Sequence, residues 1–428
     1  MSDFSLGIDF LLAQSVQSLL AMFWYTIVFE IPRYGLAFAA IGIAPIAARF
    51  MHWQVGERPR ANEAPKTISV VIVGHNEADS LELCVRSLRE QSLKAFEIVI
   101  VSDGSSDRMA SIASRLVKQG LADRALATDL RGGKPSGVNL AVRASTGQLI
   151  INVDCDCSYD RFAIENICRP FSDPTVGAVC GDIVPRNGDK SLIARFQEIE
   201  YAYTLSVGKR IAASIEQVVC VSGAFGAFRR EALDSVGGFD MGGGEDLDAT
   251  LRFRQQRWRV AFAENAVCYT DVPSTLWTLF RQRMRWERDV IWIRYRKHRR
   301  LMNPRFQRFA LAEAFHQWDF LAFNIMGAVV FPIYIVWLYL TYGAFATPIL
   351  VAMQLGLCAL DIPMLAITAR ITGRPIFWRN LPYLPGYSAF CSYGMRLIRL
   401  CAYAEEWFLS ASRWDNYTPL KVRTVRKW

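Results

Sequence analysis

The middle of the chain alternates short apolar runs with amphipathic stretches. Ile68 to Val73 reads ISVVIV, Glu97 to Val101 reads EIVIV, and Gln148 to Val153 reads QLIINV. Each is typical of a strand buried on both faces. Helices are predicted from Ala78 to Gln91 and near Arg108 to Gln119. This alternation predicts an α/β domain with a mostly parallel sheet, whose ligands bind beyond the carboxyl ends of the strands.

Longer apolar runs flank this pattern and predict membrane segments. Phe10 to Phe29 carries no charged residue, nor does Phe320 to Tyr342, and Thr347 to Thr368 contains only Asp361. About 20 apolar residues suffice for a helix to span a bilayer. An acidic residue inside a span is costly in lipid, so Asp361 is expected to face a hydrated path or to bond a neighbouring helix.

Two further apolar runs are harder to assign. Tyr34 to Ala48 is short for a span, and Leu381 to Leu400 contains prolines and arginines. The second of these predicts a kinked span or a helix lying in the membrane interface. The arginines that follow Ala48 indicate that the next segment is cytoplasmic, because cytoplasmic flanks are rich in Lys and Arg.

The expected organisation has five parts and describes an integral protein of the bacterial inner membrane. They are an N-terminal membrane region (residues 1–50), a cytoplasmic α/β domain (51–275), interfacial amphipathic helices (276–308), a C-terminal transmembrane region (309–405) and a basic cytoplasmic tail (406–428).

Composition agrees with a water-facing domain joined to membrane helices. Hydrophobic residues make up 52% of the chain and charged residues 21%, with a formal net charge of +9. The basic residues crowd the flanks of the apolar runs, which favours contact with anionic lipid over nucleic acid as the reason for the charge. The ten cysteines show no paired ligand spacing, and only four histidines are present, so a reduced compartment and no His-rich metal site are expected.

Carboxylates stand at the ends of the predicted strands. Asp154 and Asp156 follow the third strand in VDCDC, and two such groups can hold Mg²⁺ or Mn²⁺, although D-x-D is also common as an acidic turn. Asp103 ends the second strand, where it can bind a nucleoside or shape the turn. Lys134 follows two glycines and suits a phosphate, or is a solvated loop lysine.

A second acidic pair, Glu245 and Asp246, follows a glycine-rich stretch. A group transfer onto a hydroxyl needs one general base to take the proton, and Asp246 is the candidate. Acids are also favoured at helix starts, which offers a purely structural explanation. The segment that begins QRMRW at Gln282 combines Arg, suited to diphosphate, with Trp, suited to a sugar face or a membrane interface.

The motifs GHNE, SDGSSD, GGKPSGVN, VDCDC, VSGAFGAFRREAL, GGFD, GGED and QRMRW follow one another in this order. The set resembles the processive family 2 glycosyltransferases, which include cellulose, chitin, hyaluronan and poly-N-acetylglucosamine synthases. The resemblance implies a GT-A nucleotide-sugar fold and a channel formed by the membrane helices. His75, where a Tyr is usual, and Gly244, where a Thr is common, depart from the pattern and leave the sugar undetermined.

The resemblance also implies a role for each matched residue. These are nucleotide-sugar binding for Glu77, Asp103, Lys134, Asp154, Gln282 and Arg285, the metal for Asp154 and Asp156, the acceptor for Ser222, Gly223 and Trp286, and catalysis for Asp246 with Glu245 beside it.

Two enzymatic functions agree with these residues. The first is transfer from UDP-glucose or UDP-N-acetylglucosamine to a growing β-linked polysaccharide, with export through the membrane region. The second is a single transfer to a membrane lipid, since ceramide glucosyltransferases have a similar motif order. A non-catalytic scaffold has no need of all these carboxylates together. The few predicted spans suggest that a small partner subunit or a second copy of the chain completes a polymer path.

Overall fold

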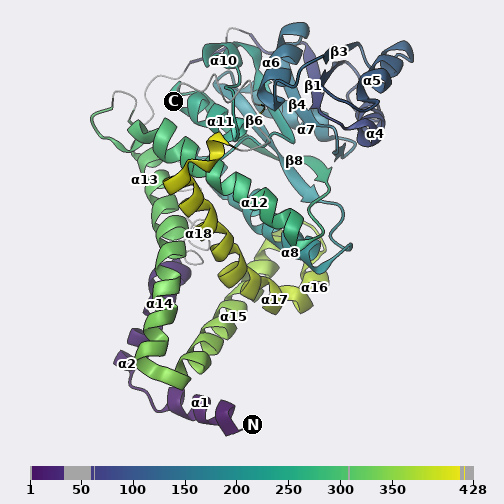
Figure 1. The fold of residues 1–428 in the computed structure, drawn as a ribbon. Coiled ribbons are helices and arrows are strands. Elements are labelled where there is room, and N and C mark those ends of the chain that lie inside the picture. The colour runs from purple at the N-terminus through teal and green to yellow at the C-terminus, as the bar shows by residue number, and fades with distance from the viewer. Residues whose placement is uncertain (1, 33–58, 62, 307–308, 415–418, 420–428) are drawn as a thin grey trace.

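The structure is a computed structural model and describes residues 2–32, 59–61, 63–306, 309–414 and 419. An α/β domain forms one end of the molecule, and a helical hairpin projects from it (Figure 1). The predicted apolar run Tyr34 to Ala48 lies outside the described residues, as does most of the predicted basic tail.

One eight-stranded sheet forms the centre of the α/β domain, in the order β3-β2-β1-β4-β7-β6-β8-β5. The strands are β1 (Ile68–Gly74), β2 (Glu97–Asp103), β3 (Arg124–Thr128), β4 (Leu149–Asp154), β5 (Ser158–Tyr159), β6 (Val176–Pro185), β7 (Phe225–Arg229) and β8 (Arg259–Thr270).

The sheet is mixed and mostly parallel, as predicted. β1 pairs in parallel with β2 and β4, β2 with β3, and β6 with β8, whereas β7 runs antiparallel to β4 and β6 and β5 antiparallel to β8. The three strands predicted from apolar runs correspond to β1, β2 and β4. β3 escaped prediction because RALAT is short and partly exposed, without a buried apolar run.

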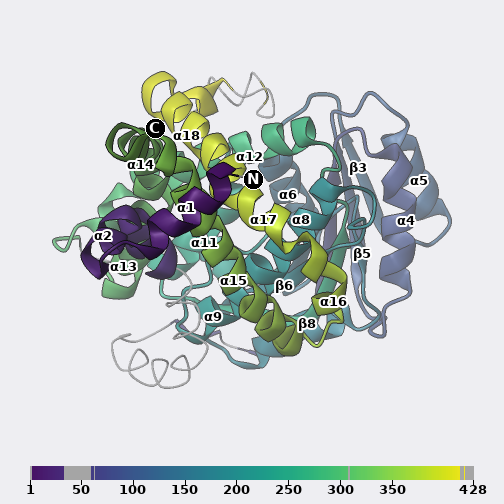
Figure 2. The same cartoon turned by 90° about the horizontal axis from the view of Figure 1, so that it is seen from below.

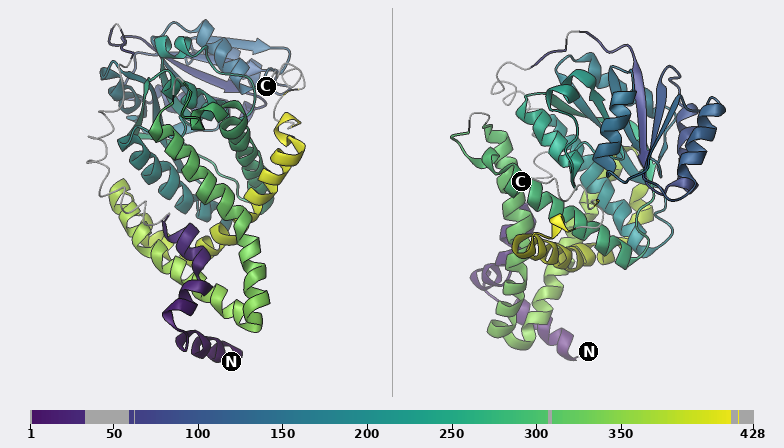
Figure 3. Two further views of the ribbon diagram at one scale, coloured as in Figure 1. Left: turned by 90° about the vertical axis from the view of Figure 1, so that its left-hand side faces the viewer. Right: turned by 45° about the horizontal axis from the view of Figure 1, so that its top comes forward.

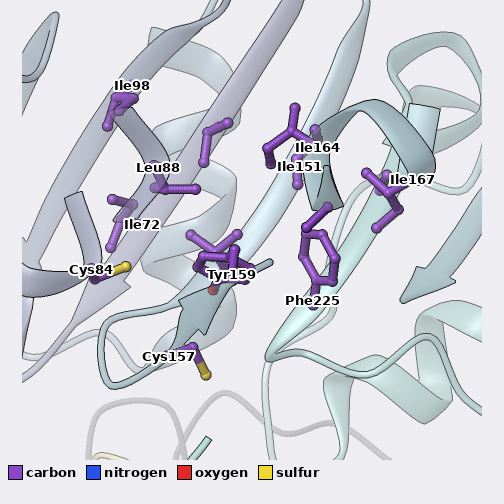
Figure 4. Packing of buried hydrophobic residues seen from close by; sticks show 14 of the residues in the cluster. Ile72, Cys84, Leu88, Ile98, Ile151, Cys157, Tyr159, Ile164, Ile167 and Phe225 are labelled. Atoms are coloured by element: carbon purple, nitrogen blue, oxygen red, sulfur yellow. The ribbon is translucent and has the colours of Figure 1, made fainter. Parts of the chain in front are cut away.

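Helices cover both faces of the sheet, and the strand residues alternate between two cores. Val70 and Ile72 face α4 (Ala78–Arg89), α5 (Met109–Lys118) and α7 (Ala163–Cys168), and Figure 4 shows part of this core. Val71 and Val73 face α6 (Lys134–Ala144), α10 (Arg230–Ser235) and α11 (Glu245–Gln255) on the other side. Burial on both faces explains why β1 is a continuous apolar run.

Further helices lie between β6 and β7 and after β8. The elements are α8 (Leu192–Tyr201), the π-helix η3 (Ala202–Gly208), α9 (Lys209–Ser214), α12 (Leu276–Ile291), the π-helix η4 (Trp292–Lys297), α13 (Leu311–Asp319), α14 (Gly327–Tyr342), α15 (Ala346–Thr372), α16 (Ile376–Asn380), α17 (Leu384–Ala389) and α18 (Arg396–Ala404).

The hairpin of α14 and α15 corresponds to the two strongest predicted spans (Figure 3). Leu311–Thr372 is long and apolar enough to cross a membrane by length and composition, and only 28% of its most apolar window is buried inside the protein. Asp361 on α15 is buried, and the Tyr203 hydroxyl of η3 donates to its carbonyl oxygen at 3.1 Å. α15 therefore packs against η3 at the buried Asp361.

The N-terminal apolar run is not one helix. α1 (Ser2–Leu12) ends before α2 (Val16–Met22), because the Ser15 hydroxyl accepts the Ser18 N–H and caps a new helix. Both lie beside the hairpin, away from α4 and α5 (Figure 2). Leu381 to Leu400 is divided into the short segments η8 (Leu381–Tyr383), α17, η9 (Phe390–Met395) and α18, with its two prolines in the first two. Its place across the membrane or in the interface stays a prediction.

Candidate active site

The carboxyl ends of β1, β2 and β4 meet at one edge of the sheet, because these three strands are parallel neighbours. A cavity of about 210 Å³ opens there. The polar side chains that line it come from four separate places in the sequence and are His75, Glu77, Asp103, Arg131, Lys134, Asp154 and Asp156. The structure thus gathers all five predicted nucleotide-binding and metal residues of the α/β domain.

Asp103 shapes the loop that carries Lys134. Its carboxylate accepts the N–H groups of Gly132 and Gly133, each at 2.7 Å, from a position only 3% exposed. Gly133 has φ +88°, a conformation that favours glycine, and it caps the helix that Lys134 begins. The His75 ring contacts the Asp103 carbonyl oxygen at 2.8 Å. These bonds fix the start of α6, and with it Lys134, at the edge of the cavity.

The Lys134 ammonium donates to the Asp154 carboxylate across the cavity floor. Desolvation raises the pKa of Asp154; the charge of Lys134 opposes this rise, and the charge of Asp156 adds to it. Desolvation also raises the pKa of Glu77, and its bond from Ser80 opposes this, while Asp156 and Asp154 raise the pKa further. The cavity therefore concentrates negative charge that a cation would relieve.

The donor set suits a hard divalent cation, which prefers carboxylate oxygens. Within the residues that the structure describes, no group of three or more His, Cys, Asp or Glu side chains is arranged to hold a metal ion. The cavity offers two such carboxylates, those of Asp154 and Asp156. In phosphate-binding sites Mg²⁺ is typically held by one or two carboxylates together with substrate oxygens and water.

Glu245 and Asp246 open α11, directly after Gly244, whose φ of +68° turns the chain into the helix. The Asp246 carboxylate accepts the N–H of Gly223 at 3.4 Å and that of Leu247 at 2.7 Å. The Gly223 carbonyl in turn accepts the Asn152 amide at 2.8 Å. The two residues therefore begin a helix, as the structural explanation expects, and Asp246 also contacts the predicted acceptor segment, while its role as the base stays a prediction.

Gly223 lies between the two halves of the site. A methyl group built on it would stand 2.8 Å from Lys134 Nζ and 3.7 Å from Glu245 Oε1. Desolvation and the charge of Asp246 raise the pKa of Glu245 to about 7, and the charge of Lys134 opposes this rise. Gly223, Lys134 and the acidic pair of α11 are therefore immediate neighbours.

The QRMRW residues lie on α12, which continues into η4 along the glycine-rich segment before Glu245. A methyl group on Gly243 would stand 2.4 Å from Asp289 Oδ1, and one on Gly244 would stand 2.5 Å from Ile293 Cδ1. Gln282 and Arg285 are half-buried on α12, and Trp286 is 36% exposed. α12 therefore supports the acidic pair by close packing.

Some site neighbours were not predicted. Asn152 orients Gly223, and its signal is a polar residue within the apolar run of β4. Arg283 donates to Glu200 at 2.7 Å and lies 4.6 Å from the centre of the Trp286 ring. Lys209 donates to Ser222 at 2.6 Å. The last two rest on contacts between distant segments, which no local pattern reveals.

The model of the family described as "Glycosyl transferase family 2" matches residues 69–237, which contain this cavity and the Gly223 segment. The chain contains a family 2 glycosyltransferase domain. Poly-beta-1,6-N-acetyl-D-glucosamine synthase of Staphylococcus aureus (strain MSSA476) is 27% identical over 243 residues, 56% of this chain and 58% of that protein. The same-named protein of Staphylococcus epidermidis is 27% identical over 221 residues, 51% of this chain and 53% of that protein.

The chain thus spans somewhat over half the length of the curated relatives it matches. Among solved structures, the mannosyltransferase PcManGT from Pyrobaculum calidifontis, in complex with GDP-Man and Mn²⁺, is similar with a TM-score of 0.53 and 20% identity. The similarity covers 88% of this chain and 99% of that one. It shows the fold, and the predicted GT-A-like α/β architecture is confirmed.

Proposed function

We propose that the chain is a membrane-bound, metal-dependent, inverting glycosyltransferase that extends a β-linked polysaccharide from a UDP-sugar. One observation carries the proposal. Lys134, Asp154 and Asp156 line one cavity, and Gly223 joins that cavity to Asp246. A donor diphosphate and an acceptor base are thereby neighbours, as direct displacement requires.

The donor is UDP-glucose or UDP-N-acetylglucosamine. The names of the Staphylococcus relatives favour N-acetylglucosamine, and the GDP-mannose and Mn²⁺ of the solved mannosyltransferase support a nucleotide sugar with a divalent cation. Glu77 and Asp103 hold the nucleoside side of the cavity. Asp154 and Asp156 would hold Mg²⁺ or Mn²⁺, which when bound would offset the charge that develops on the departing diphosphate.

In the transfer, the acceptor hydroxyl attacks the anomeric carbon from the face opposite the diphosphate, so the configuration inverts. Asp246 takes the hydroxyl proton, and Lys134 stabilises the departing UDP. Glu245, with a pKa of about 7, holds a proton below that pH and then adds no charge beside Asp246.

The acceptor is the end of a glycan held beside Ser222, Gly223 and Trp286. Gln282 and Arg285, on the same helix as Trp286, line the diphosphate and acceptor end. Trp286 presents a partly exposed ring, and flat rings suit sugar faces. Trp277, at the start of α12, is 64% exposed, which supports the assignment of this helix to the membrane interface.

The α14–α15 hairpin supports an integral membrane location with the α/β domain in the cytoplasm. Its outward side chains include Ile333, Val336, Leu340 and Leu355, all more than half exposed. Apolar surface of this kind is stable against lipid. The five-part organisation predicted from the sequence is retained, and a small partner subunit or a second copy completes the polymer path.

The test supplies membranes with radiolabelled UDP-glucose or UDP-N-acetylglucosamine and sizes the product. Polymer is expected with one donor, absent in EDTA and restored by Mg²⁺ or Mn²⁺. A single sugar on lipid would replace polymer synthesis by the lipid-glycosylating function. Full activity in chelator, with metal content shown to be nil, would refute the metal dependence.

Export is tested separately in sealed vesicles that hold the purified protein with its α/β domain outward. Polymer that resists an added glycosidase until detergent is supplied supports translocation. Polymer fully exposed outside the vesicles would contradict it.

A further inference from the structure

A buried lysine lies beside the acceptor segment. Lys209 begins α9 and is only 4% exposed. Its ammonium donates to the Ser222 hydroxyl at 2.6 Å and to Cys180 Sγ at 3.0 Å. Lysines are rarely buried unless paired with a carboxylate, and these two partners are a hydroxyl and a sulfur. This position therefore requires an explanation.

The nearby carboxylate of Asp182 is engaged elsewhere. Asp182 accepts Arg374 at 2.5 Å through one oxygen and Ser206 at 2.7 Å through the other. Desolvation lowers the pKa of Lys209, but Cys180, Cys220 and Asp182 oppose this and the net pKa is raised, so Lys209 keeps its charge in the interior. Its hydrogen bond to Ser222 is the contact that joins Lys209 to the predicted acceptor segment.

Ser222 connects Lys209 to the proposed base. The next residue, Gly223, donates its N–H to Asp246 and accepts Asn152 on its carbonyl. Cys220, two residues before Ser222, lies between the same two charges: burial raises its thiol pKa, Asp246 raises it further and Lys209 opposes this. The segment 220–223 is thus bonded to Lys209 through the Ser222 hydroxyl and to Asp246 through the Gly223 N–H.

We propose that Lys209 is a positioning residue that holds Ser222, and with it the segment 220–223, so that the acceptor hydroxyl meets Asp246. The inference rests on the proposed function. A buried ammonium costs desolvation energy, and an apolar side chain in its place is often neutral or stabilising for the fold. The cost of Lys209 is therefore explained by the geometry of the acceptor segment.

The experiment compares Lys209→Met with a matched control, Lys118→Met, which removes an exposed lysine of α5. Transfer kinetics, UDP affinity and thermal stability are measured in the same membranes. Lys209→Met should lower kcat roughly 10-fold or more, a range typical of contacting residues. UDP affinity and the donor KM should stay at the wild-type value, because the cavity of Lys134 and Asp154 is untouched.

A double-mutant cycle separates positioning from a structural role. If Lys209 acts through Ser222, Lys209→Met should cost little more in a Ser222→Ala background than Ser222→Ala costs alone. Lys209→Gln, which keeps a donor near Ser222, should recover part of the rate. If Lys209→Met does not accumulate, Lys209→Gln and Ser222→Ala still test the inference, since wild-type kcat in both would overturn it.

The remaining outcomes also decide the question. Wild-type kcat in Lys209→Met, strictly additive losses in the cycle, or a loss of UDP affinity in parallel with stability would each overturn the inference while leaving the proposed function intact. Absence of transfer by the wild-type protein with every donor would refute the proposed function, and the inference with it.

Discussion

A methyl group added at Gly223 should move the Lys134 ammonium away from the Asp154 carboxylate. The backbone φ of Gly223 lies outside the range that disfavours side chains, so Gly223→Ala introduces no backbone strain. The new methyl group would stand 2.8 Å from Lys134 Nζ, whereas ordinary contact begins at 3.4 Å, so the ammonium must withdraw by about 0.6 Å. Glu245 Oε1, at 3.7 Å, needs no shift.

The expected cost follows from the bond that is strained. A hydrogen bond between charged groups is worth about 1.5–3 kcal/mol, and a lysine that rotates aside keeps part of it. A loss of about 1–2 kcal/mol lowers kcat/KM for the UDP-sugar roughly 5- to 30-fold. Thermal stability should change little, because the flexible end of a lysine moves and the core does not.

The assay is initial-rate kinetics with varied UDP-sugar, together with equilibrium binding of UDP. Gly356→Ala is the matched control, since a methyl group on Gly356 in α15 meets nothing within 4 Å. In a Lys134→Ala background, Gly223→Ala should cost almost nothing further. Wild-type kcat/KM in Gly223→Ala, or an undiminished cost once the lysine is shortened, would refute the steric reasoning.

Three further predictions address the base, its neighbour and the topology. Asp246→Asn should bind UDP-sugar normally and lower kcat by roughly 10²–10⁴-fold, and near-normal turnover would remove Asp246 from the role of base. Glu245→Gln should stabilise the protein at pH 8 but not at pH 4. The native carboxyl holds its proton up to a pKa of about 7, whereas the unfolded carboxyl loses it from its usual value of 4.5. The free energy of unfolding of the wild-type protein therefore falls across this pH window, by about 1–3 kcal/mol. Equal effects on the melting temperature at both pH values, measured in chelator, would contradict this. Cysteine introduced at the exposed Lys118 should react with an impermeant maleimide only after cells are permeabilised; the ten native cysteines are all buried or half-buried, so they do not serve this purpose.

The amino-acid sequence by itself determined the parallel half of the sheet and the position of its ligand edge. The β1, β2 and β4 runs are apolar on both faces, and this local pattern does not depend on which distant segments pack against them. Asp103 and Asp154 end two of these strands, so their meeting follows from parallel pairing alone. The order of motifs also sufficed to indicate glycosyltransferase family 2, which the family match confirms.

The tertiary structure alone decided how the acceptor side is built. Gly223 is brought between Lys134 and Asp246 because β7 joins β4 antiparallel, a pairing that no local period predicts. Hydrogen bonds join Lys209, Asn152 and Arg283 to residues far along the chain or on another element. Hydropathy likewise overstated the N-terminal run, since one capping serine divides it. Local patterns record burial, whereas these contacts depend on which distant segments the folded chain places together.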